Sequence, residues 1–352
     1  MGQKGEYQLN LDDAIAAGAS ILDTRAAGGL GPFSRLEWFA LLAGALPPGE
    51  RPEVVVSRRE GASQWWMMAT PSVGRAMHSL TNWYSFAWRP ETCGDDHQRL
   101  PLACDAAREL ALRTGQLRLE PVREEDCALI VTALRRAGWL VEAEATGANH
   151  RLLIGDQGFE AWWAKRPGQM RSTVKRKGRD PAIAIRIERD FTDDDWAAFE
   201  AVYASSWKCP EGRPDLLRQF AAGEAARGQM RLGLLEWEGE VIAAQFWTVE
   251  GDTAFIHKLA HRPEHDRRSP GTLLTHALAA ACVAEGVRTI DFGTGDDPYK
   301  KQWSDDARPL YTISAHNPRR IGAWPGLAKA AAKLVARRFE PRLRLASRAP
   351  VG

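Results

Sequence analysis

Cysteine is scarce in this chain, and no two cysteines form a CxxC pair. The five residues are Cys93, Cys104, Cys127, Cys209 and Cys282. Their odd number and wide spacing argue against a disulfide framework or a zinc site, and we expect reduced thiols in a reducing compartment. No apolar run approaches the roughly 18 residues that a membrane-spanning helix requires. Met1–Asp13 is polar and lacks the apolar core of a signal peptide, so we expect a cytoplasmic protein.

A strong overall charge is also missing, because the net charge is only +2. The segment Asn317–Gly352 nevertheless carries nine Lys and Arg residues against Glu340, which is +8 and leaves −6 for the rest of the chain. This distribution argues against a general nucleic-acid-binding protein and predicts one localised electrostatic contact. Apolar residues such as Leu334 and Phe339 interrupt the basic tail. It is either an interfacial helix in weak peripheral contact with anionic lipid or, as we favour, a solvated helix docked on the body.

The length of 352 residues predicts two domains at roughly 150 residues per domain. A basic amphipathic segment at residues 158–181 marks the connection between them, because the composition changes there and Pro181 follows. We therefore expect an N-terminal domain at residues 1–157, a helical linker at 158–181, a C-terminal domain at 182–318 and a basic tail at 319–352.

The first half shows weaker patterns than the second. Helical periodicity covers residues 35–46, 106–113 and 127–137, and strand-like segments cover residues 53–58, 64–69, 116–121 and 139–144. In the second half, strands are predicted at residues 182–189, 231–237, 241–249, 253–260, 288–292 and 311–315, with helices at 192–207, 214–226 and 269–284. With a further helix after residue 295, the order is β-α-α-β-β-β-α-β-α-β.

The strand at residues 253–260 leads into Ser269-Pro270-Gly271-Thr272, which opens an apolar helix. Amides in the first turn of a helix lack intrahelical partners and, together with the helix dipole, attract anions. Arg267 and Arg268 add positive charge. The sequence thus predicts a site for a pyrophosphate, although the same residues are equally typical of an ordinary helix start.

Three segments together resemble the Fem-like, tandem members of the GNAT superfamily of acyltransferases. They are His257-Lys258-Leu259-Ala260, then Ser269 to Leu274, and Asp291-Phe292-Gly293-x-Gly295-Asp296-x-Pro298-Tyr299-Lys300-x-x-Trp303. The resemblance implies a mixed α/β fold with two tandem GNAT-like domains, of which the second binds the donor. It also implies acetyl-CoA or another acyl-CoA as co-substrate, held in part by Leu259, and a sugar or cell-envelope precursor as acceptor. We expect no metal.

Candidate catalytic residues follow from the same segments. His257 and Lys258 alternate along one strand, so they face opposite sides of the sheet. His257 could accept a proton from the acceptor, or be an ordinary hydrogen-bonded histidine. Lys258, in an apolar strand, needs a carboxylate partner or a ligand, and Asp291 is one candidate. Asp291 is the second candidate base.

The resemblance places Tyr299 to protonate the leaving thiolate. Lys300 is predicted to hold a phosphate or an acidic acceptor, and Trp303 to contact substrate or to pack in the core. Other tryptophans could stack on sugar rings, and Asn82, Trp83 and Tyr84 suggest an acceptor cleft. Two other functions stay open: a ligase that takes an aminoacyl group from charged tRNA through the basic segment 166–179, and a non-catalytic binding protein with the same fold.

Overall fold

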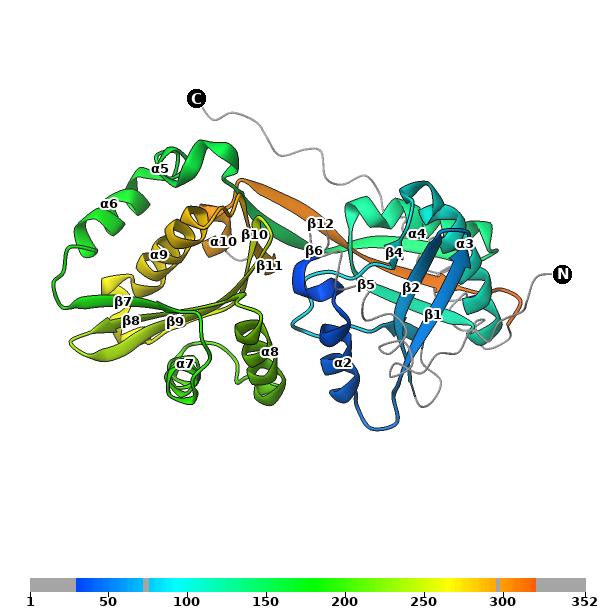
Figure 1. Ribbon diagram of the computed structural model, residues 1–352, viewed down its shortest axis with the longest axis horizontal. Helices are drawn as coiled ribbons and strands as arrows, with labels where there is room; N and C mark the ends of the chain where they lie inside the picture. Colours follow the sequence, from blue (N-terminus) through cyan, green and yellow to red (C-terminus); the bar gives the residue numbers. More distant parts are fainter. Residues whose placement is uncertain (1–29, 72–75, 296–297, 321–352) are drawn as a thin grey trace, which may run out of the picture.

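A computed structural model describes residues 30–71, 76–295 and 298–320. The described chain forms two lobes connected by long strands (Figure 1). Its twelve strands belong to a single sheet, ordered β1-β2-β3-β5-β12-β6-β11-β10-β9-β8-β7, with β4 paired to β2. The fold is therefore mixed α/β, as expected from the sequence.

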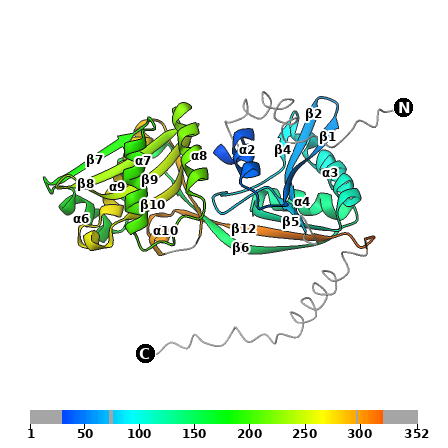
Figure 2. The same ribbon diagram turned by 90° about the horizontal axis from the view of Figure 1, so that it is seen from below.

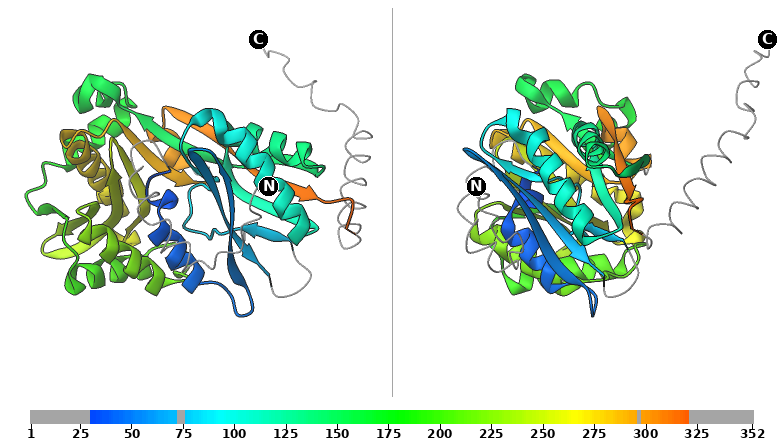
Figure 3. Two further views of the ribbon diagram at one scale, coloured as in Figure 1. Left: turned by 45° about the vertical axis from the view of Figure 1, so that its right-hand side comes forward. Right: turned by 90° about the vertical axis from the view of Figure 1, so that its right-hand side faces the viewer.

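The N-terminal lobe contains a strand meander followed by a helix, a strand, a second helix and a long strand. Its elements are η2 (Gly31–Ser34), α2 (Leu36–Gly44), β1 (Arg51–Arg59), β2 (Ala62–Thr70), β3 (Met77–Ser79), β4 (Glu91–Cys93), η3 (Asp96–Gln98), α3 (Arg99–Arg113), β5 (Gln116–Arg123), α4 (Glu124–Arg136) and β6 (Leu140–Leu153). Helices α3 and α4, teal in Figure 3, cover one face of this half of the sheet.

Two short helices lead from the first lobe to the second, which repeats the pattern of meander, helix, strand and helix. The elements are η4 (Gly155–Gln157), α5 (Gly158–Trp163), α6 (Gly168–Lys177), β7 (Ile183–Glu188), α7 (Asp193–Ser205), α8 (Pro214–Ala226), β8 (Met230–Trp237), β9 (Glu240–Glu250), β10 (Thr253–His261), η5 (Pro263–Arg268), α9 (Pro270–Ala284), β11 (Thr289–Thr294), α10 (Pro298–Trp303) and β12 (Asp306–His316). The predicted order of this half is confirmed.

Local sequence explains why these elements begin and end where they do. The Thr192 hydroxyl accepts a hydrogen bond from the Asp195 amide at 3.2 Å, which caps the start of α7. Glu238 and Gly239 both have positive φ and make the tight turn between β8 and β9. Gly251 makes the corresponding turn between β9 and β10.

The two lobes exchange their last strands. In the first lobe, β3 and β5 are parallel neighbours, and in the second, β10 and β11 are. Strand β6 then leaves the first lobe and pairs with β11, whereas β12 leaves the second lobe and pairs with β5. The two exchanged strands also pair with each other along their length, as the orange and green ribbons in Figure 2 show. The halves are thus arranged as related copies of one pattern.

The apolar core lies in two clusters on either side of the second lobe's sheet. One cluster joins the N-terminal lobe to α7, α8 and the adjoining face of the sheet, and the other packs α5, α6, α9 and α10 on the opposite face. The contact between the lobes is therefore part of the main core.

Several expectations from the first half were incomplete. The short strands β3 and β4 were not predicted, and β6 runs to Leu153 instead of ending near residue 144. Strand β12, which was assigned to the C-terminal domain, lies between β5 and β6. The division of the chain into domains and a linker at 158–181 stays a prediction.

None of the helices in the described part of the chain has the length and apolar character needed to cross a membrane. The proposed basic tail from residue 321 onward lies outside the described residues.

Candidate functional site

Strands β10 and β11 part soon after they meet. They pair in parallel only from Thr253 to Phe255, and β10 then carries an irregularity between Ile256 and Lys258 in its pairing with β9. A cleft of about 850 Å³ opens where the strands diverge. Both lobes line it: Asn82, Trp83, Tyr84 and Phe86 from the first, and from the second Tyr203, the segment 207–213, Leu217, Phe220, residues 256–259, Phe292, Thr294, Gly295 and Lys300.

Lys258 lies at the base of this cleft in a cluster of polar side chains. Its Nζ is 2.6 Å from Glu211 Oε2, and the lysine and carboxylate side chains are only 6% and 13% exposed. The Nζ also lies 4.6 Å from the ring centroid of Tyr84 and 5.4 Å from that of Tyr203. The partner of Lys258 is thus Glu211, and the predicted pairing with Asp291 is wrong.

The cluster perturbs the ionisation of its members. Burial lowers the pKa of Lys258, although the Glu211 carboxylate opposes this change. Burial and contact with Glu211 raise the pKa of Tyr203 to about 12, and the same causes raise the pKa of Tyr84. Tyr84 donates its hydroxyl hydrogen to Glu211 Oε1. Both phenols therefore stay protonated at neutral pH.

His257 lies in an aromatic enclosure on the same strand. Phe246 and Phe220 each have ring centroids 5.0 Å from the imidazole, and Thr248 Oγ1 is 2.8 Å from Nε2. Burial, with smaller effects from the charges of Lys258 and Arg35, lowers its pKa to about 3. An imidazole this weakly basic is a poor proton acceptor at neutral pH. The structure therefore argues against the predicted base role.

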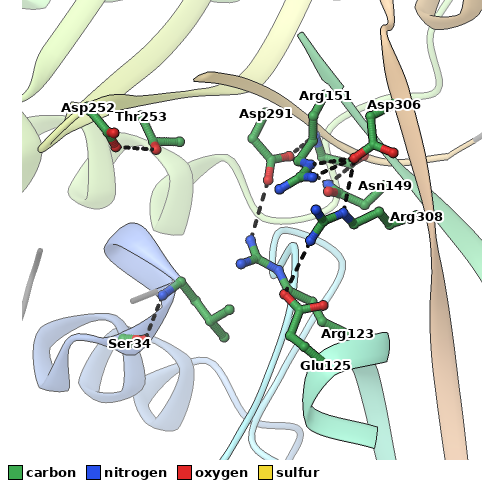
Figure 4. Close-up of polar contacts among 12 residues, drawn as sticks. Ser34, Arg123, Glu125, Asn149, Arg151, Asp252, Thr253, Asp291, Asp306 and Arg308 are labelled. Atoms are coloured by element: carbon green, nitrogen blue, oxygen red, sulfur yellow. Dashed lines mark hydrogen bonds and ion pairs between the residues drawn. The ribbon is translucent and has the colours of Figure 1, made fainter. Parts of the chain in front are cut away.

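Asp291 is buried and connects three segments of the sheet (Figure 4). Its Oδ1 accepts hydrogen bonds from Asn149 Nδ2 at 2.6 Å and from the Gly293 amide at 2.7 Å. Its Oδ2 is 3.4 Å from Arg123 Nη2 on β5. Asp291 does not belong to the residues that line the cleft. Its contacts support a structural role where the exchanged strands meet, rather than the predicted catalytic role.

The start of α9 has the predicted Ser-Pro-Gly geometry but fewer available amides. The Ser269 amide donates to Asp266 O at 2.9 Å, Thr272 donates to Ser269 O at 3.1 Å, and Pro270 has no N–H. Among these positions, the Gly271 amide alone has no hydrogen-bond partner within the described part of the chain. The sequence predicted several amides without a partner at this turn, and the structure corrects this number to one. The backbone of Ser269 has a positive φ of +54°.

Positive side chains surround this turn. Lys177 Nζ on α6 donates to Ser269 Oγ at 2.7 Å and to Arg267 O at 2.5 Å. The guanidinium of Arg268 lies 3.6 Å from the ring centroid of Trp237, so it stacks on that ring. His261 at the end of β10 is hydrogen-bonded to Asp266 Oδ1 at 2.6 Å. The turn thus has the cations Lys177, Arg267 and Arg268 beside the acids Glu264 and Asp266, and Lys177 is a member that the sequence did not indicate.

The three predicted residues of α10 have different surroundings. The Tyr299 hydroxyl is 2.8 Å from Thr275 Oγ1 and 3.4 Å from Gly271 O, so it lies at the first turns of α9. Lys300 lines the cleft, and its Nζ donates to Thr294 O at 2.5 Å. Trp303 is fully buried among other aromatic rings. This burial supports the packing role expected for Trp303 and argues against its contact with substrate.

Sequence reasoning missed Glu211 and Tyr203, which come from the region around α7 and α8. The signal available in the sequence was Lys258, which was predicted to need a carboxylate partner. Nothing in the sequence, however, distinguished Glu211 from the other acidic residues as that partner. Among the described tryptophans only Trp83 and Trp207 are exposed, by 85% and 59%, and both line the cleft. Asn82, Trp83 and Tyr84, where the sequence suggested an acceptor cleft, also line this cleft, and the acceptor itself stays a prediction.

Comparison with known proteins identifies the second lobe. Residues 164–301 match the family model of the acetyltransferase (GNAT) domain. This match confirms the expected GNAT domain and hence a transferase fold. Comparison with curated proteins gives no match.

Solved structures share the fold of the whole chain. FemX superposes with a TM-score of 0.62 at 10% identity, covering 84% of this chain and 94% of FemX. The C-terminal domain of a protein named as a lysylphosphatidylglycerol synthetase from Agrobacterium fabrum gives 0.58 at 13% identity, covering 93% and 98%. A tandem GNAT protein from the clavulanic acid biosynthesis pathway gives 0.51 at 13%, covering 89% and 98%. These similarities establish a fold shared with tandem GNAT proteins.

Proposed function

Because residues 164–301 form a GNAT domain, we propose that the protein is an acyl-CoA-dependent N- or O-acyltransferase. The acceptor's amine or hydroxyl attacks the donor thioester directly, without a covalent enzyme intermediate. The observation that carries this proposal is the parting of β10 and β11 at the start of a cleft lined by both lobes. Such an opening provides an unpaired strand edge beside a space for two substrates.

The donor is proposed to lie along the edge of β10. From Ile256 to Leu259 this strand is no longer paired with β11, so its backbone groups are available to the amides of a pantetheine arm. The acyl carbonyl is then polarised by a strand amide. Further along, the Gly271 amide, the dipole of α9, Lys177 and Arg267 attract the pyrophosphate.

The second lobe alone is proposed to hold the donor. The helix that occupies the corresponding place in the first lobe is α3, and it is preceded by the acids Asp95 and Asp96. These two carboxylates would repel a diphosphate. The turn before α9 holds Glu264 and Asp266 as well, but Arg267, Arg268 and Lys177 of α6 lie beside them.

Tyr299 is proposed to return a proton to the departing thiolate. Its hydroxyl, hydrogen-bonded to Thr275 at 2.8 Å, lies beside the donor's proposed path. Proton transfer to a leaving group typically contributes about 10²-fold or more to the rate.

The acceptor is proposed to be a sugar or an envelope precursor that carries one. Two observations support this class. Trp83 and Trp207 expose their rings at the same cleft, one from each lobe, and an aromatic face packs well against the apolar face of a pyranose. Lys300 also lines the cleft, where it could bind an acidic group of the acceptor.

Calorimetry with acetyl-CoA and longer acyl-CoAs tests the donor site. We expect wild type to bind, and Gly271→Glu to lose at least about tenfold in affinity, because a carboxylate at the turn repels the diphosphate. Gly44→Glu is the matched control, since a side chain there meets nothing within 4 Å. Equal affinity in wild type and Gly271→Glu, with both proteins folded, would remove the proposed site.

A second candidate function is supported by α6. This basic helix packs on α9, and its residues Arg171, Lys175 and Arg176 are exposed beside the turn. An aminoacyl-tRNA donor, as in a Fem-like ligase, would use such charges for phosphate contacts. Binding of charged tRNA that weakens steeply between about 50 and 200 mM salt would favour this function. Saturable acetyl-CoA binding with no transfer would instead favour a non-catalytic protein.

A further inference from the structure

We propose that Glu211 takes the proton from the acceptor, and that Tyr84, Tyr203 and Lys258 hold its carboxylate in position. This assignment rests on the acyltransferase function proposed above and adds the missing base. It also makes the N-terminal lobe part of the active centre, because Tyr84 comes from that lobe.

Glu211 is the one carboxylate among the described residues that line the cleft. It lies in the segment between α7 and α8, opposite the strand edge where the thioester is expected. The two candidates from the sequence are unsuitable, because His257 has a pKa of about 3 and Asp291 is buried behind the sheet's hydrogen bonds. Among the described residues that line the cleft, Glu211 is therefore the best placed to act as the base, directly or through a water molecule that it orients.

The contacts of Glu211 leave room for a proton. Oε1 accepts the hydroxyl hydrogen of Tyr84, while Oε2 lies 2.6 Å from Lys258 Nζ. The Oε2 atom is itself buried at the base of the cluster. Each carboxylate oxygen can accept more than one hydrogen bond, so these contacts do not use up the proton-accepting capacity of Glu211.

The position of Lys258 connects this carboxylate to the donor. Lys258 follows the irregularity in β10, directly where the strand leaves β11. Its ammonium lies over the rings of Tyr84 and Tyr203, which fixes both the lysine and the carboxylate. The proton acceptor is therefore held beside the strand edge by residues from three separate segments.

The chemical step balances with these groups. The acceptor's nitrogen or oxygen forms a bond to the thioester carbonyl carbon as its proton passes to Glu211. The carbon–sulfur bond then breaks, the thiolate leaves as coenzyme A, and it takes a proton from Tyr299. Glu211 later releases its proton to solvent. No oxidant or reductant is needed.

Release of coenzyme A from acetyl-CoA tests the assignment, with water or glucosamine as acceptor. We expect Glu211→Gln to lower kcat at least about 100-fold while its acetyl-CoA affinity stays at the wild-type value. It should also abolish the fall in rate on the acid side of the pH profile. Glu211→Asp should recover part of the rate. Asp215→Asn, an exposed acid four positions away that does not line the cleft, is the matched control.

Lys258→Met tests the positioning role. Removing a positive neighbour disfavours the carboxylate, so the acid limb of kcat/KM should move to higher pH. The other charged or titratable groups among the described lining residues are unchanged in this variant: Tyr84, Tyr203, Lys208, Cys209, Arg213, His257 and Lys300. Tyr84→Phe should lower kcat more than it raises KM.

The outcomes separate the two proposals. Wild-type protein that binds acetyl-CoA, with Glu211→Gln releasing coenzyme A at the wild-type rate, overturns this assignment alone. Wild-type protein that binds no acetyl-CoA, or binds it and never releases coenzyme A, overturns the proposed acyltransferase and this assignment with it. An unshifted pH profile in Lys258→Met overturns its positioning role.

Discussion

Two phenylalanines contact glycines across the boundary between the lobes. Phe86 of the first lobe lies against Gly293 of β11, and a Cβ on this glycine would be 2.7 Å from the ring. Phe255 of β10 lies against Gly31 of the first lobe, where a Cβ would be 2.3 Å away. Both glycines also have positive φ, at +67° and +63°. Close contact and backbone conformation thus both require glycine at these positions.

Gly293→Ala is therefore expected to lower the free energy of unfolding by about 2–4 kcal/mol. The control is Gly251→Ala, since Gly251 has φ +59° but nothing within 4 Å of its Cβ position. The control should lose only about 1 kcal/mol from backbone strain. Urea unfolding of both variants measures the difference. Equal losses would show that Phe86 moves aside without cost.

Because of the low pKa of His257, we expect the folded protein to lose stability in mild acid. Its pKa falls from 6.5 to about 3 on folding, so the unfolded chain binds the proton and the folded chain does not. The contribution of neutral His257 to the free energy of unfolding is fully present above about pH 6.5. It decreases as the pH falls toward the pKa of the imidazole in the folded protein. Between about pH 7.5 and 5.5 the loss is at most about 1.4 kcal/mol, an upper bound because the ring is partly exposed to the cleft.

Chemical unfolding of wild type and His257→Gln at these two pH values measures the effect. The variant, with no titrating imidazole, should lose less stability between them. If the difference in free energy of unfolding between wild type and His257→Gln is the same at both pH values, the low pKa of His257 is contradicted.

At the residue scale, sequence identified several positions in the cleft but not all of their contacts. Lys258 was recognised as a lysine that needs a partner, because charge in an apolar strand is costly. Which carboxylate meets it depends on the path between α7 and α8, which no local pattern encodes. The prediction that Trp303 contacts substrate failed for a related reason. A tryptophan looks the same in the sequence whether it is buried in the core or stacks on a sugar ring.

Helix α6 is the element whose position adds most to the proposed donor site. It comes before the GNAT strands in the sequence, yet it packs on α9 and brings Lys177 to the Ser-Pro-Gly turn. Burial, and then the nearby charge of Arg176, lowers the pKa of Lys177. An anion at the turn would favour its charged form.

Lys177→Met is expected to weaken acetyl-CoA binding about three- to tenfold and to reduce its salt dependence. Lys175→Met is the control, because Lys175 is an exposed lysine of the same helix, whereas Lys177 donates hydrogen bonds to Ser269 and Arg267. Calorimetry at about 50 and 200 mM salt gives both quantities. If both variants bind alike, Lys177 serves only to hold α6 on α9.

At the element scale, prediction succeeded where local signals are strong. The second half has long strands, Gly turns and a Thr192 cap, and its order was predicted correctly. The missed strands β3 and β4 have three residues each, too few for an alternating pattern. Residues 145–151 of β6 look loop-like, with Gly147 and Asn149 among them, and pairing with β12 and β11 makes them strand.

For the whole molecule, the exchange of β6 and β12 makes each lobe depend on the other. Without β12, the β5 edge would lack a partner, and without β6 the β11 edge would. Each exposed edge would be a site for aggregation. This arrangement could not be predicted from sequence, because β6 and β12 carry no pattern that shows which strand they join. It also explains how residues of both lobes come to line one cleft.

A buried ionic cluster also connects the two lobes. Arg35 from the first lobe lies 2.7 Å from Glu224 on α8 and 3.0 Å from Glu250 at the end of β9. All three side chains are nearly inaccessible to solvent. Burial, partly opposed by Arg35, raises the pKa of Glu224. The guanidinium thus holds two carboxylates that would otherwise repel each other inside the contact between the lobes.

Arg35→Met should consequently destabilise the protein by about 3–5 kcal/mol at neutral pH, because it leaves buried carboxylates without their cation. Since the pKa of Glu224 is raised in the fold, lowering the pH protonates this carboxyl more readily in the folded than in the unfolded chain. The loss of stability in Arg35→Met should therefore shrink as pH falls toward about 5.

Arg35→Met combined with Glu224→Gln and Glu250→Gln should recover most of the loss at neutral pH, because this cluster then buries no charge. Thermal and urea unfolding of the three proteins across this pH range measures the effect. If the triple variant is as unstable as Arg35→Met at neutral pH, the lobes depend on the packing of the Arg35 stem rather than on its charge.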